Sequence, residues 1–169
     1  LKTTVDALPE LISEKSLSVL EKHKVYSRTE CRSRYEIMLE DYNKTLHIEM
    51  LCMLEMAKQE ILPACTKYIN KIADGIAAKE SIGIFVPNEK ELVKKLSKHA
   101  EDLIEAINKL DSLADSVPEN DAYETAKYYK DRVIPQMDIL RKSSDELETM
   151  VGKDFWPFPT YTELLYSII

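Results

Sequence analysis

The sequence predicts an all-α fold: an antiparallel bundle of long, proline-kinked helices, with a short N-terminal helix and an aromatic/proline tail that ends in a short helix. The 169 residues include only three glycines, and Lys, Glu, Leu and Ala are plentiful, a composition that favours helices. Apolar residues recur every three or four positions along three long stretches. With 44% hydrophobic residues, the chain is large enough for one domain with its own core, predicted over residues 1–169.

The first predicted helix opens near Asp6 and continues through Leu20. Pro9 stands early in it, where the missing N–H of proline costs nothing. The sequence "HKVYS" then breaks the apolar pattern.

A much longer helix is predicted from Ser27, because Glu30 follows three residues later and completes a capping-box pattern. Pro63 lacks a backbone donor and crowds the preceding turn, so we expect a kink there and continuation to about Ala78. The apolar stripe of this helix comprises Tyr35, Met38, Leu39, Tyr42, Leu46, Met50, Met53, Leu54, Ala57 and Ile61.

Two further helices follow the loop "SIGIFVPN". Asn88 with Glu91 predicts the start of the first, whose stripe runs from Leu92 to Ala114. The second follows "SVPEND" and contains Pro135, which predicts a second kink. The segments "EILPAC" and "RVIPQM" both have aliphatic residues directly before proline. Two kinks at matching height in facing helices would explain this similarity, and chance is the alternative explanation.

The tail "DFWPFPTYTELLYSII" ends the chain differently. Its prolines stop the preceding helix, and Thr160 with Glu163 forms a capping box for a short last helix. Its aromatic surface is too large to leave in water, which predicts that the tail docks on the bundle or on another part of a longer protein. The predicted docking residues are Phe155, Trp156, Pro157, Phe158, Pro159 and Tyr161.

The net charge of −7 argues against a nucleic-acid partner. No stretch is long and apolar enough to span a membrane, and the first residues lack a signal-peptide pattern, so we expect no membrane partner and a cytoplasmic location. Three cysteines within helical patterns fit reduced, buried thiols. The absence of methionine at Leu1 predicts a C-terminal fragment.

No pattern of chemical residues predicts a catalytic, cofactor-binding or metal site. The Glu-x-x-His spacing of di-iron bundles is missing at all three histidines. The three glycines stand apart, so no phosphate-binding loop is present. His47 and Cys52 are expected on different helix faces and do not form a nucleophile pair.

The segment "LHIEMLCMLEMA", residues 46–57, is apolar beyond a single stripe, with nine apolar residues in twelve. A helix apolar nearly all round is buried on several sides. It is either the central helix of this domain or an interface with a surface outside this chain. In the second case the interface residues are Leu46, Met50, Met53 and Met56.

The segments "SRYEIMLEDYNKTLHIE", "MAKQEILPACTKYI" and above all "DFWPFPTYTELLYS" resemble the C-terminal region of type III glutamine synthetases, the long-subunit bacterial class. The opening "TTVDALPELISEKSLSVLEKH" resembles the segment that follows the catalytic barrel in that family. The resemblance covers nearly the whole chain, with residues 80–120 matched only as a helical insert.

The resemblance implies a full-length enzyme that joins ammonia to glutamate, with ATP and Mg²⁺ or Mn²⁺ bound by an upstream barrel. It also implies a dodecamer, so the expected partners are the chain's own catalytic domain and neighbouring subunits. No family catalytic motif matches here, and the chain alone is expected to be non-catalytic. The alternative is an independent helical-bundle protein-interaction module.

Overall fold

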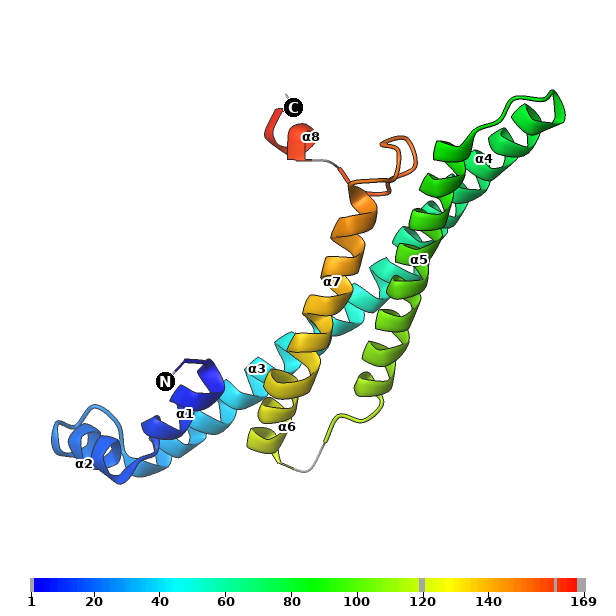
Figure 1. The fold of residues 1–169 in the computed structure, drawn as a ribbon. Coiled ribbons are helices and arrows are strands. Elements are labelled where there is room, and N and C mark those ends of the chain that lie inside the picture. The colour runs from blue at the N-terminus through cyan, green and yellow to red at the C-terminus, as the bar shows by residue number, and fades with distance from the viewer. Residues whose placement is uncertain (1, 119–120, 160, 167–169) are drawn as a thin grey trace. The chain divides into compact units, whose positions relative to one another are not determined.

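The computed structural model describes residues 2–118, 121–159 and 161–166, except for the side chains of Tyr161 and Thr162. The described residues contain helices and no strand, which confirms the all-α class (Figure 1). In chain order the elements are α1 (Thr4–Leu11), α2 (Glu14–Lys22), α3 (Arg28–Met56), η1 (Ala57–Ile61), α4 (Leu62–Ser81), α5 (Pro87–Ala114), α6 (Ala122–Tyr128), η2 (Tyr129–Val133), α7 (Ile134–Glu148) and α8 (Tyr161–Tyr166).

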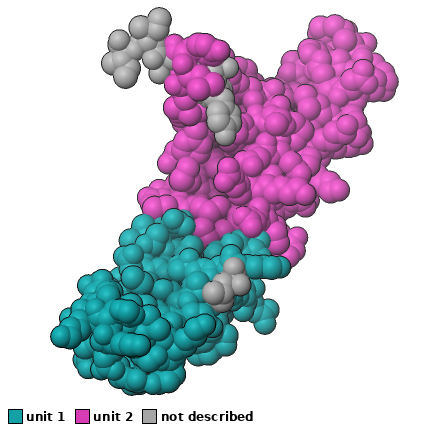
Figure 2. Space-filling model, turned by 90° about the vertical axis from the view of Figure 1, so that its left-hand side faces the viewer, with its two compact units in different colours: residues 1–51, 112–135 teal, residues 52–111, 136–169 magenta. Residues whose placement is uncertain are grey.

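The chain divides into two compact units, coloured separately in Figure 2. Unit 1 comprises residues 1–51 and 112–135, and unit 2 comprises residues 52–111 and 136–169. Each unit therefore combines an earlier and a later part of the sequence.

Unit 1 contains two short N-terminal helices where the sequence predicted one. The Ser13 hydroxyl accepts a hydrogen bond from the backbone N–H of Ser16 at 3.3 Å and caps α2. Such a cap satisfies a donor that a new helix leaves unpaired, so the chain ends α1 at Leu11 and restarts. The single-helix prediction was therefore wrong at this point.

The core of unit 1 joins α1, α3 and α6 through Val5, Leu39 and Ala126, each at most 1% exposed. Beside it, the Lys130 ammonium contacts the Asp6 carboxylate at 2.6 Å. The Lys130 hydrogen bond holds the pKa of Asp6 below its ordinary value. This ion pair thus joins α1 to η2, which lies more than 100 residues later in the sequence.

The start of α3 matches its prediction closely. The Ser27 backbone N–H donates to Glu30 Oε2 at 2.7 Å, and the Glu30 N–H donates to Ser27 Oγ at 3.3 Å. This reciprocal pair is the predicted capping box.

In unit 2, α4 and α5 form an antiparallel helical hairpin that also packs with α7. The α5 stripe supplies six buried residues to the core of unit 2, and the buried amide of Gln136 donates to the Ala106 carbonyl at 3.2 Å. The buried α5 residues are Leu96, Ala100, Leu103, Ala106, Ile107 and Leu110.

A wider, π-helical turn precedes each proline for which the sequence predicts a kink. The N–H of Leu62, directly before Pro63, donates to the Ala57 carbonyl, and the N–H of Ile134, directly before Pro135, donates to the Tyr129 carbonyl. A proline ring crowds the carbonyl of the preceding turn, and a wider turn moves that carbonyl away. The helical path therefore continues through both prolines.

Candidate functional site

The first part of the tail packs on α4 within unit 2. The rings of Phe155 and Tyr68 lie 5.2 Å apart between centroids and are tilted by 54°. The Lys71 ammonium lies 5.0 Å from the Phe155 ring centroid. A Cβ added to Gly152 would lie 3.1 Å from the Tyr68 ring, so the absence of a side chain there allows this close approach.

The next two aromatic residues of the tail, Trp156 and Phe158, lie edge to face with ring centroids 6.4 Å apart. Together with parts of α3, η1 and α7 they line a depression of about 210 Å³, here called the tail groove. Its apolar lining comprises Met53, Met56, Ala57, Ile61, Leu140, Trp156 and Phe158. The groove lies entirely within unit 2.

The remaining tail is more open to solvent. Pro157 and Pro159 are exposed, and Lys153 pairs with Glu163 at 2.8 Å. On α8 the exposed residues are Leu164, Leu165 and Tyr166. Thr160, the predicted cap of α8, and the side chain of Tyr161 lie outside the described residues.

The four possible interface residues of α3 differ in exposure. Leu46 and Met50 are buried within the chain, at 9% and 0% exposure. Met53 is half-buried and Met56 is 40% exposed, and both line the tail groove. Only the second pair is therefore within reach of another surface in this conformation.

Sequence reasoning assigned no role to the loop between α4 and α5, yet this loop exposes three large apolar side chains. Ile82, Ile84 and Phe85 are 74%, 49% and 75% exposed. The signal in the sequence was the apolar run "IGIFV" inside a segment otherwise identified only as a loop.

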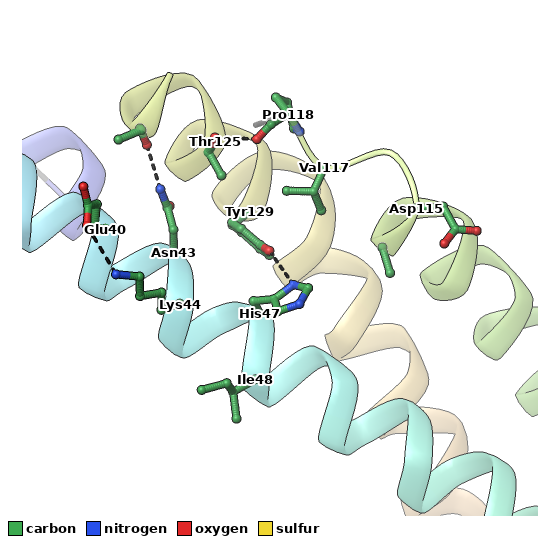
Figure 3. Close-up of a pocket in the computed structure, with 12 residues that line it drawn as sticks. Glu40, Asn43, Lys44, His47, Ile48, Asp115, Val117, Pro118, Thr125 and Tyr129 are labelled. Atoms are coloured by element: carbon green, nitrogen blue, oxygen red, sulfur yellow. Dashed lines mark hydrogen bonds and ion pairs between the residues drawn. The ribbon is translucent and has the colours of Figure 1, made fainter. Parts of the chain in front are cut away.

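Unit 1 has a larger depression of about 870 Å³ between α3 and the segment that leads into η2 (Figure 3). Several of its polar groups are bonded: the Asn43 amide N–H donates to the Ala122 carbonyl at 2.8 Å, while its buried Oδ1 has no hydrogen-bond partner, and Lys44 pairs with Glu40 at 3.3 Å. His47 Nδ1 lies 3.0 Å from the Tyr129 hydroxyl. The Asn43 and His47 contacts connect α3 with α6 and η2, and the Lys44–Glu40 pair lies within α3. None of these contacts places a nucleophile beside a base at a common point.

Among the described residues, no group of three or more His, Cys, Asp or Glu is arranged to hold a metal ion. His99 Nδ1 lies 3.1 Å from Glu146 Oε2, so this histidine contacts a carboxylate across α5 and α7.

Comparison with known proteins places these features in a family. Residues 1–80 match the family described as "Glutamine synthetase C-terminal domain". A glutamine synthetase of Butyrivibrio fibrisolvens is 34% identical over 171 residues, which cover 99% of this chain and 24% of the relative. A type-3 glutamine synthetase of Dictyostelium discoideum is 31% identical, with 98% of this chain and 24% of the relative covered. A glutamine synthetase of Bacteroides fragilis is 24% identical, with 96% and 23% covered.

This chain belongs to the glutamine synthetase C-terminal domain family through its residues 1–80. It spans about a quarter of the length of these curated relatives. The family match ends within α4, whereas the alignments with the relatives extend over nearly all of this glutamine synthetase C-terminal domain. The resemblance carried by the tail is thereby confirmed at the level of the family. No helix in the described part of the domain has the length and apolar character needed to cross a membrane.

The three thiols of this glutamine synthetase domain should differ in reactivity. Cys31 and Cys65 are 0% exposed, and burial raises the pKa of Cys65 to about 11, whereas Cys52 is exposed. Because the thiolate is the nucleophile, we expect DTNB to label Cys52 in the native domain and all three cysteines after denaturation. Rapid labelling that persists in Cys52→Ser would contradict the described burial.

Proposed function

We propose that this chain is the non-catalytic C-terminal domain of an ATP-dependent glutamate–ammonia ligase that works in the cytoplasm. In this proposal the domain supports the packing of the catalytic domain or the assembly of subunits into an oligomer, with the dodecamer as the expected form. The observation that carries the proposal is the family match over residues 1–80, joined to relatives named glutamine synthetases that align with nearly all of this chain.

The described residues form no site that fits the cofactors such a ligase requires. Mg²⁺ takes oxygen ligands together with the phosphates of its nucleotide, and the described residues hold no suitable cluster. Gly75, Gly83 and Gly152 are far apart in the sequence and form no Gly-rich phosphate loop. The proposal therefore assigns ATP, Mg²⁺ or Mn²⁺, and glutamate to another part of the full-length enzyme, and assigns no reaction step to this chain.

The direct test is an activity assay of the purified chain with glutamate, ammonium, ATP and Mg²⁺. We expect no glutamine and no phosphate release above the background without protein. ATP-dependent amide synthesis by the chain alone would overturn the non-catalytic role.

The exposed apolar loop residues Ile82 and Phe85 favour a second candidate, an independent protein-interaction module. The coding sequence upstream of Leu1 separates the two. A long β-rich, glutamate-bearing segment in the same reading frame supports the ligase domain, and an initiating methionine close to Leu1 supports the independent module.

A further inference from the structure

The loop between α4 and α5 presents an apolar surface that the described residues of unit 2 leave largely exposed. We call residues 82–86 the hairpin tip; Ile82 and Phe85 are each about three-quarters exposed, and Ile84 is half exposed. Large apolar side chains scattered singly on a surface are ordinary, but three within one short loop mark an interaction site.

The hairpin tip is held in this shape by local contacts. Gly83, at φ +81°, has the left-handed conformation that glycine adopts most easily, and its N–H donates to the Glu80 carbonyl at 3.0 Å. Across the base of the hairpin, Lys79 contacts Glu89 at 2.6 Å, and Lys90 pairs with Glu80. A surface held in place before binding loses less conformational freedom when a partner arrives.

Unit 2 also has a receptor of matching chemistry. The tail groove has a lining of methionine, aliphatic and aromatic side chains, and methionine adapts its shape to an incoming group. Its charged lining residues are Arg141, Asp145 and Glu148, one guanidinium against two carboxylates. The Lys90 ammonium, which also pairs with Glu80, lies 6.0 Å from the centroid of the Phe85 ring and would accompany that ring to this acidic edge.

The hairpin tip cannot reach the groove of its own chain. Ile61, in the groove, lies directly before the first residue of α4, and the hairpin tip follows the last. The 20 residues of α4 separate them by roughly 30 Å, at about 1.5 Å per residue. A tip that enters such a groove must therefore come from another molecule.

We propose that the hairpin tip of one copy of this chain inserts Phe85 into the tail groove of a second copy. The contact is head to tail, because each copy offers a tip on one side and a groove on the other. Such contacts repeat from copy to copy and generate closed rings or open filaments. The inference rests on the assembly role proposed above, because it names a contact through which two subunits could associate. It does not depend on whether the chain is catalytic.

Sedimentation velocity of the 169-residue chain over a range of concentrations tests this contact. We expect the wild-type chain to associate, and Phe85→Glu in the tip or Met56→Glu in the groove to weaken association by about tenfold or more. Both side chains are exposed, at 75% and 40%, so the variants should fold, which circular dichroism verifies. Val25→Glu, at another exposed apolar residue (55%), is the matched control and should associate like wild type.

The decisive sample is an equal mixture of the two defective variants. The Phe85→Glu copy keeps its groove and the Met56→Glu copy keeps its tip, so one intact contact remains and the mixture should form a heterodimer that grows no further.

A wild-type chain that stays monomeric overturns the proposed contact. Loss of association in Phe85→Glu alone indicates tip-to-tip pairing, and loss in Met56→Glu alone indicates that another segment fills the groove; either result overturns the proposal. Inactivity of the chain in the ligase assay has no bearing on these outcomes.

Discussion

Replacing Tyr129 with alanine should lower the free energy of unfolding by about 3–5 kcal/mol, the usual cost of removing a large buried aromatic ring. Tyr129 is 2% exposed and is the largest fully buried side chain of the described residues. It lies at the first position of η2, where its ring packs inside unit 1 and its hydroxyl reaches His47 on α3. The change leaves a cavity at the junction of two helices, and urea unfolding followed by circular dichroism measures the loss.

Tyr129→Phe is the matched control, because it keeps the ring and removes only the hydroxyl. Burial raises the pKa of Tyr129, so the phenol keeps its proton, and its oxygen lies 3.0 Å from His47 Nδ1; the tautomer of the imidazole decides which of the two groups donates. His47 is exposed and can bond to water instead, so the loss should be about 0.5–1.5 kcal/mol. Equal losses in the two variants would show that the ring contributes little packing energy.

Local signals in the sequence predicted much of the fold. The capping box at Ser27 and Glu30 sets the start of α3, because its partners are three residues apart and their hydrogen bonds depend on nothing distant. The α5 stripe likewise predicted Leu96, Leu103 and Leu110 as core, and all three are 0% exposed. Periodicity predicts well when one helix face alone decides burial.

The sequence was less informative where two local preferences compete. Ser13 can continue a helix or cap a new one, and apolar periodicity across residues 8–20 does not distinguish these outcomes. Proline was expected to kink a helix, and the form of the response, a π-helical turn before Pro63 and Pro135, depends on how the surrounding side chains pack. Met38, assigned to the core stripe, is 45% exposed, so the stripe predicted more buried positions on α3 than the structure has.

The candidate site shows the same limit. Aromatic content predicted that Phe155 and Trp156 pack against something, but Tyr68, the partner of Phe155, is 87 positions away in the sequence, and no local pattern connects them. The hairpin tip was missed because a loop is identified by its breakers, Gly83 and Pro87, which say nothing about where its apolar side chains point. Contacts between segments that are distant in the sequence could therefore be identified only from the structure.

Replacing Leu103 with alanine is the corresponding large change in unit 2. Leu103 is 0% exposed at the centre of the α5 core, so the free energy of unfolding should fall by about 2–5 kcal/mol. The next residue is the matched control: Ile104 is 41% exposed, and Ile104→Ala should cost much less, because most of its side chain is already in water. Similar losses in the two variants would contradict the orientation of α5.

Leu103→Ala and Tyr129→Ala together also test whether residues 1–169 unfold as the single domain that the sequence predicts. The only tryptophan, Trp156, lies in unit 2, so its fluorescence reports that unit, whereas circular dichroism reports all helices. In a single cooperative domain both variants shift one transition, and the two signals coincide. If Tyr129→Ala moves only part of the circular dichroism transition and leaves the Trp156 signal in place, the two compact units unfold separately, and the loss measured for each variant belongs to its own unit.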